Sequence, residues 1–162
     1  DSRRASKRDS RRASRRSFHI PSRLLPKGAR EGWLFKRSKT LRKNWKRRYF
    51  VVEPNEVRIA YKSDRDGPVR GYIDLRDAKL QTPRLDQPRA HRNPNITSER
   101  EFSIQEGGTG RKVELCAATD DEFYSWIELL RRVISAEAEF RATGRLRGTG
   151  KPNKWVASAT DA

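Results

Sequence analysis

One feature of the sequence constrains the fold of this chain most: several strand-like runs follow one another and a single helix-like segment comes after them. Short runs rich in β-branched and aromatic residues are separated by turn formers such as Pro54 and Gly107, a pattern typical of antiparallel strands. One amphipathic segment, typical of a helix, comes after them. We expect strands at residues 32–37, 45–52, 56–62, 70–75, 78–82, 101–106 and 111–117.

The helix is expected to begin directly after Thr119. Thr119 and Glu122 have the spacing of a capping box. Apolar residues then recur every three or four positions and predict one buried face, with Trp126 in the core: Phe123, Trp126, Ile127, Leu130, Val133 and Ile134. The sequence thus predicts a mainly β protein with one C-terminal helix, in which a seven-stranded antiparallel barrel or sandwich is capped by that helix.

The net charge of +17 is concentrated in two segments. Residues 1–31 hold 11 basic and 3 acidic side chains, and residues 36–48 hold 8 basic and no acidic ones. The rest of the chain is almost neutral, so we expect a polyanionic partner that meets a defined surface. The sequence has no apolar run of the roughly 20 residues that a membrane span needs.

The single cysteine, Cys116, excludes internal disulfides and fits a reducing compartment, so we expect a cytoplasmic protein. We interpret the chain as a piece of a longer protein. The predicted organisation is a disordered basic Arg/Ser tail at 1–28, a folded domain at 29–140 with an inserted loop at 83–98, and a flexible C-terminal tail at 141–162.

The N-terminal tail contains two Arg-Arg-Ala-Ser motifs that resemble substrates of basic-directed protein kinases. They make four serines candidate phosphorylation sites, which are Ser6, Ser14, Ser10 and Ser17. A plain solvated basic tail, or one that acts as a nuclear address, is the alternative.

Strand alternation predicts where the basic residues of the first two strands point. If Leu34 and Phe50 face the core, then Lys36 and Arg48 point to the same side of the sheet, near the mouth of the expected barrel. Lys46 points to that side as well. The intervening loop adds further cations, Lys39, Arg42 and Lys43. Clustered phosphates need several such donors, so the hairpin is a candidate phosphate-binding site.

No pattern predicts an enzyme, a metal or a cofactor. His19 and His91 lie in separate segments far from Cys116, so no metal-ligand spacing exists. Neither a serine-histidine-acid set nor a carboxylate pair can be proposed from the spacing.

Three sequence segments and Trp126 together resemble the pleckstrin homology (PH) domain over about residues 29–137. The segments are EGWLFK at 31–36, NWKRRYFVV at 44–52 and GYIDL at 71–75. The nearest resemblance is to cytohesin-type phosphoinositide receptors. It implies that the domain binds phosphoinositides and recruits a larger cytosolic protein to membranes.

The resemblance also implies specific contacts. Lys36 followed by Lys46-Arg47-Arg48 is similar to the motif K-Xn-(K/R)-X-R, which implies phosphate contacts from Lys36, Lys46 and Arg48, with Lys43 as a fourth. Such members usually carry a tyrosine on the third strand. Here we expect Ile59 or Ala60 at that position and Tyr61 out of register.

Three other interpretations remain open. The basic strands could be a solvated pair without a ligand, or the fold could bind a small GTPase or a peptide with little lipid selectivity. Nucleic acid is the least favoured partner, because only Trp45 and Tyr49 are placed to stack on bases.

Overall fold

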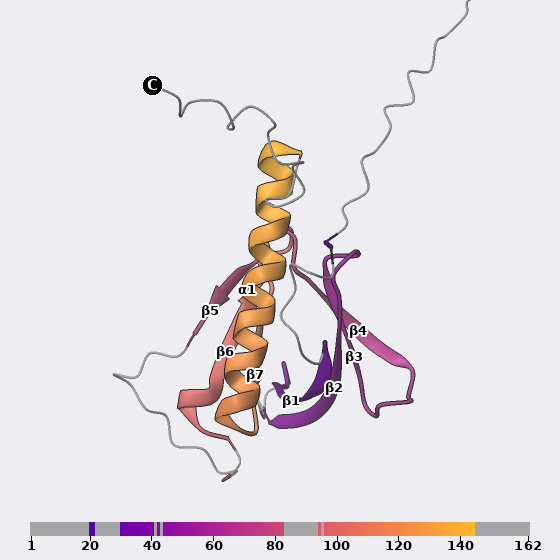
Figure 1. Ribbon diagram of the computed structural model, residues 1–162. Coiled ribbons are helices and arrows are strands. Elements are labelled where there is room, and N and C mark those ends of the chain that lie inside the picture. Colours follow the sequence, from indigo (N-terminus) through magenta and orange to yellow (C-terminus); the bar gives the residue numbers. More distant parts are fainter. Residues whose placement is uncertain are drawn as a thin grey trace, which may run out of the picture.

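The computed structural model describes residues 20–21, 30–40, 42, 44–82, 94 and 96–144, which form one antiparallel sheet and one long helix (Figure 1). The strands follow the order β4-β3-β2-β1-β7-β6-β5. A short 3-10 helix, η2, precedes β6. The elements are β1 (Glu31–Arg37), β2 (Trp45–Glu53), β3 (Arg58–Lys62), β4 (Val69–Asp74), β5 (Lys79–Gln81), η2 (Ser98–Arg100), β6 (Glu101–Gln105), β7 (Lys112–Cys116) and α1 (Asp120–Thr143).

The predicted fold class is confirmed, and every strand begins and ends within two residues of its expected bounds. The sheet is open, with β4 and β5 as its two edges. Strand β1 joins the two halves, because it pairs with β2 from Glu31 to Arg37 and with β7 at Phe35 and Lys36.

Helix α1 packs its apolar side against both halves of the sheet (Figure 1). The predicted cap is present, since Thr119 Oγ1 accepts a hydrogen bond of 3.2 Å from the Glu122 amide. Trp126 is 6% exposed and lies edge-on to Phe50, with 6.5 Å between the ring centroids. On the other half of the sheet, Phe102 packs edge-on against Phe123. Among the described residues, no helix combines the length and the apolar character needed to cross a membrane.

Two isoleucines outside the expected elements are buried. Ile20 falls within the predicted tail and Ile96 within the predicted inserted loop, yet each side chain is only 3% exposed. Ile20 belongs to the same core cluster as Leu34 and Leu130. The hydrophobic core therefore includes Ile20, although this residue lies well before the first strand in the sequence.

A buried carboxylate ties the β6–β7 turn to strand β4. Glu106 receives hydrogen bonds from the Arg111 guanidinium, from Thr109 Oγ1 at 2.6 Å and from the Asp74 amide at 3.0 Å. Arg111 also donates to the carbonyl of Tyr72, at 2.5 Å. Burial by itself would raise the pKa of Glu106, but these hydrogen bonds outweigh it and lower the pKa. Side-chain bonds thus connect the free edge strand β4 to the other half of the sheet.

Replacing Trp126 by alanine should damage folding. Truncating a buried aromatic side chain costs about 3 to 5 kcal/mol, so the free energy of unfolding in urea should fall by about that amount. Tyr124→Ala is the matched control, because Tyr124 lies on the same helix and is 68% exposed. Comparable losses in the two variants would contradict the core position of Trp126.

Acid should destabilise the protein through Glu106. Its folded pKa lies below the usual 4.5, so the stabilisation is present above that value and is lost as pH falls through the folded pKa. Glu106→Gln should lose roughly 2 kcal/mol at neutral pH and show a smaller further loss at about pH 3 than the parent. Urea unfolding at both pH values measures this, and an unchanged acid response in the variant would contradict it.

Candidate functional site

The register of β1 and β2 brings the predicted cations together on the inner face of the sheet. Lys36 lies directly opposite Lys46, and Leu34 lies opposite Arg48. Leu34 is 1% exposed and belongs to the core, so alternation places all three cations on the core-facing side. Lys36 and Arg48 are half-buried, whereas Lys46 is exposed. The inner face therefore changes from apolar to cationic toward the end of the hairpin.

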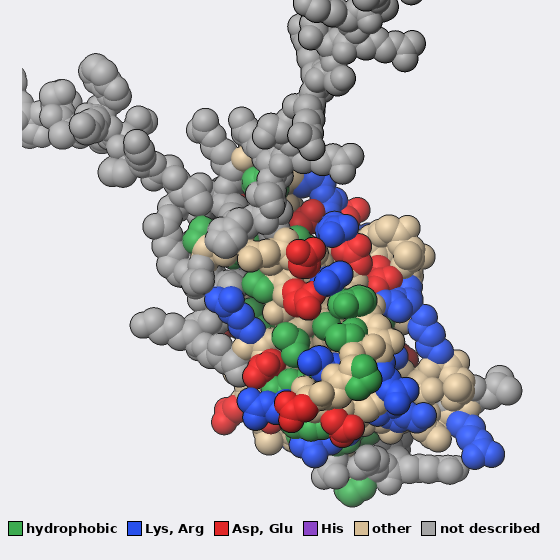
Figure 2. Space-filling view, turned by 90° about the vertical axis from the view of Figure 1, so that its right-hand side faces the viewer, with side chains coloured by type: hydrophobic (Ala, Val, Ile, Leu, Met, Phe, Trp, Pro, Cys, Tyr) green, Lys and Arg blue, Asp and Glu red, His purple; other side chains and the backbone are tan. Residues whose placement is uncertain are grey.

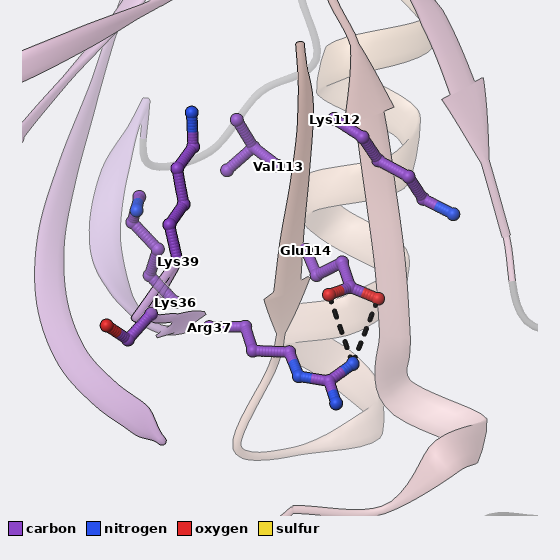
Figure 3. A pocket seen from close by; sticks show the side chains of 7 residues that line it. Lys36, Arg37, Lys39, Lys112, Val113 and Glu114 are labelled. Atoms are coloured by element: carbon purple, nitrogen blue, oxygen red, sulfur yellow. Dashed lines mark hydrogen bonds and ion pairs between the residues drawn. The ribbon is translucent and has the colours of Figure 1, made fainter. Parts of the chain in front are cut away.

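Lys36 is held at the junction of the two half-sheets. Its backbone pairs with Lys46 on one side and with Leu115 of β7 on the other. Beside it lies an open cavity of about 190 Å³, which is lined by Lys36, Arg37, Ser38, Lys39, Lys112, Val113 and Glu114. Figure 3 shows Lys36 and Lys39 together on one side of this cavity.

Glu114, on the other side of the cavity, forms an ion pair with Arg37. Both carboxylate oxygens accept hydrogen bonds of 3.1 Å from Arg37 Nη1 (Figure 3). Because Arg37 satisfies this carboxylate, Glu114 is less available to neutralise Lys36.

Positive charge surrounds the Lys36 ammonium. Burial, followed by the nearby cations Lys39, Arg111 and Arg48, lowers the pKa of Lys36 from its usual 10.5. Each of these cations disfavours a further positive charge, so the site has an electrostatic cost that a bound anion would relieve.

Tyr61 is the functional candidate that the sequence analysis missed. The expectation that it lies out of register is wrong: Tyr61 pairs with Phe50 and shares the inner face, whereas Ala60 pairs with Val51 on the outer face. The Lys36 Nζ lies 5.2 Å from the centroid of the Tyr61 ring, within cation–π range. The two-residue spacing from the apolar Ile59 to Tyr61 is the signal that could have identified it.

Gly71 provides the space for the Tyr61 ring. The two residues are paired across β3 and β4, and a Cβ atom at position 71 would lie 2.7 Å from Tyr61 Cζ. A methyl group there cannot coexist with the ring in this position. The absence of a side chain at Gly71 therefore allows Tyr61 to lie beside Lys36.

The structure describes only some of the remaining residues that the sequence analysis proposed for the site or for phosphorylation. Lys39 and Arg42 are exposed in the loop between β1 and β2. Lys43 and the candidate phosphorylation sites Ser6, Ser10, Ser14 and Ser17 lie outside the described residues. In the part of the chain that the structure describes, no group of three His, Cys, Asp or Glu side chains could hold a metal ion.

Comparison with known proteins identifies a family for most of the folded part. Residues 29–135 match the PH domain family. The chain is 25% identical over 115 residues to a PH domain-containing protein of Dictyostelium discoideum, covering 71% of this chain and 23% of that protein. The chain thus spans about a quarter of the length of this curated relative.

Solved structures show the same fold. The C-terminal PH domain of pleckstrin in complex with D-myo-Ins(1,2,3,5,6)P5 has a TM-score of 0.52 at 24% identity, covering 64% of this chain and 92% of that one. The PH domain of human oxysterol binding protein-related protein 11 has a TM-score of 0.51 at 20% identity, covering 80% and 92%. These matches do not support the finer resemblance to cytohesin-type domains.

Gly71→Ala should displace Tyr61 from Lys36. The added methyl group forces the ring into another rotamer, so the protein should lose about 1 to 3 kcal/mol of stability and the Tyr61 ring signals should shift in NMR spectra. Gly108→Ala is the control, because a Cβ atom there would meet nothing within 4 Å. Unchanged Tyr61 signals in Gly71→Ala would show that the ring does not depend on this glycine.

Proposed function

Because this chain belongs to the pleckstrin homology (PH) domain family, we propose that it binds the phosphorylated inositol headgroups of membrane lipids on the inner face of the β1–β2 hairpin. Lys36, Lys46 and Arg48 make the first contacts, and Lys39, Arg42 and Lys43 add to them from the loop. Binding would bring the larger protein that carries this domain to a membrane surface. The domain itself carries out no reaction.

The observation that carries the proposal is the position of Lys36, which is half-buried on the inner face directly opposite Lys46. The pKa of Lys36 is lowered first by burial and then by three cations, Lys39, Arg111 and Arg48. A solvated basic strand pair would keep its ammonium groups in water and well separated. Here Lys36 and Arg48 are half-buried on the same face, with Lys39 and Lys46 near Lys36, and such a group of cations favours a compact ligand with several phosphates.

Arg48 and Lys36 offer complementary modes of recognition. The Arg48 guanidinium presents a planar set of donors, which suits two oxygens of one phosphate. The Lys36 ammonium acts as a compact point charge held 5.2 Å from the Tyr61 ring centroid. Tyr61 limits the directions in which this ammonium can move, and its hydroxyl is a further donor for a phosphate oxygen.

The structural relatives are consistent with this ligand class. The similar C-terminal PH domain of pleckstrin was solved with an inositol pentakisphosphate. At 24% identity the similarity extends to the fold, so the ligand of this chain rests on its own residues. Selectivity among phosphoinositide isomers would depend on the loop that contains Lys39 and Lys43.

Arg48→Ala should weaken binding to phosphoinositide vesicles about tenfold or more, because each hydrogen bond to a charged group contributes roughly 1.5 to 3 kcal/mol. Arg58→Ala removes the same charge on the outer face, where Arg58 pairs with Glu53 at 2.5 Å and stacks on Tyr72. It should change the affinity by less than about threefold.

Vesicle sedimentation with phosphoinositide isomers, and with phosphatidylserine at matched charge, measures both variants. Equal losses from Arg48→Ala and Arg58→Ala would rule out a pocket and leave a general charge attraction. Equal binding of the parent to phosphoinositide and phosphatidylserine vesicles would contradict headgroup recognition.

A further inference from the structure

The outer face of the β1–β4 half-sheet carries aromatic rings where an antiparallel sheet usually exposes polar side chains. Trp33 and Tyr49 are paired across β1 and β2 and lie edge-on, with 5.2 Å between their centroids. Tyr72 on β4 is 42% exposed. Figure 2, viewed from the side of β2, β3 and β4, shows hydrophobic side chains among basic and acidic ones on this face.

Arginine side chains lie over these rings. The guanidinium carbon of Arg47 is 4.5 Å from the Trp33 ring centroid, that of Arg58 is 4.0 Å from Tyr72, and that of Arg65 is 6.0 Å from Tyr49. Stacking of this kind restricts the guanidinium group while leaving its N–H donors free for an acceptor. The face therefore presents donors that are already oriented.

Arg47 differs from the other stacked arginines in its partners. Arg58 pairs with Glu53 at 2.5 Å, and Arg65 pairs with Glu31 at 3.6 Å. Among the described residues, no carboxylate forms an ion pair with Arg47, which is exposed. Lys62, opposite Tyr49 in the register, adds a further cation beside the rings.

We propose that this face, centred on Trp33 and Arg47, docks an acidic segment of a partner protein. A carboxylate of the partner accepts a two-point hydrogen bond from Arg47, and the side chains next to that carboxylate pack on the half-buried Trp33. Tyr49 is only 5% exposed, so it supports the Trp33 ring and does not contact the partner. Interfaces concentrate binding energy in Trp, Tyr and Arg, which are the residue types gathered here.

The charges on this face favour an acidic protein segment over the chain's own N-terminal segment, nucleic acid or a lipid bilayer. The chain's own N-terminal segment, residues 1–30, holds 11 basic and 2 acidic side chains, so its net charge has the same sign as the arginines and disfavours it as the occupant. Glu31, Glu53 and Asp74 also lie on the outer face, since their strand neighbours pair on the core side. These carboxylates disfavour a continuous polyanion such as nucleic acid or a bilayer, whereas a few spaced carboxylates on a peptide can avoid them.

The test uses a synthetic peptide of alternating glutamate and alanine and follows the Trp33 indole N–H signal of the full chain by NMR. The glutamate peptide should shift this signal saturably, and a peptide with glutamine in place of glutamate should not. Arg47→Ala should weaken the interaction about fivefold or more, and Arg47→Lys should weaken it also, because lysine keeps the charge but loses the planar donor set.

Two control variants distinguish binding at the outer face from a general charge attraction and from binding at the inner site, which is the proposed headgroup site at Lys36, Lys46 and Arg48. Arg131→Ala removes an exposed arginine of α1, and Arg48→Ala removes an inner-face cation; each should leave the peptide affinity within about twofold. If either control variant lost as much peptide affinity as Arg47→Ala, the proposal would be overturned. It would also be overturned if a thymidine oligonucleotide, followed by the same Trp33 signal, bound more tightly than the peptide. Headgroup binding by Arg47→Ala is measured separately with phosphoinositide vesicles, so failure here leaves the inner site unaffected.

Discussion

Strand β1 is hydrogen-bonded on both of its edges, and the rest of the architecture depends on that arrangement. It pairs with β2 along seven residues and with β7 at Phe35 and Lys36, so one strand connects two half-sheets. Its core-facing residues Leu34 and Gly32, the latter beside the Trp126 ring, provide part of the surface on which the helix packs. Because neighbours on both sides fix the backbone of β1, the sheet sets the positions from which the cationic side chains of β1 and β2 extend.

The inner site places an electrostatic cost on the folded protein that packing elsewhere must offset. Lys36 is partly desolvated and close to other cations, which is unfavourable without an anion. The helix–sheet core supplies the opposing stabilisation, with Leu34, Phe50 and Leu130 almost fully buried. An anion bound at the proposed site would remove this repulsion, so binding would also stabilise the fold.

Local patterns were sufficient to predict the strands, the capped helix and the inner-facing basic residues, because alternation and periodicity are encoded over a few positions. The relation between strands was harder to predict. The β2–β3 turn contains Val57 at a φ of 53°, and this turn sets the register that carries Tyr61 to the inner face. The Glu106 contact with the Asp74 amide joins residues 32 positions apart, and no local pattern indicates it. Buried Ile20 was missed because the apolar residues around it, such as Phe18 and Leu24, follow neither the helix nor the strand period.

The paired register of β1 and β2 also bears on how this domain can vary in evolution. Successive residues of both strands point to opposite sides, with Lys36 inward and Arg37 outward. An insertion or deletion of one residue inside either strand would exchange the two sets, burying tryptophan and arginine side chains while exposing Leu34. Within the β1–β2 hairpin, a change of length preserves both faces only in the connecting segment 38–44. Relatives that keep this architecture should therefore differ in the length of that segment, where a change leaves the two strand faces undisturbed.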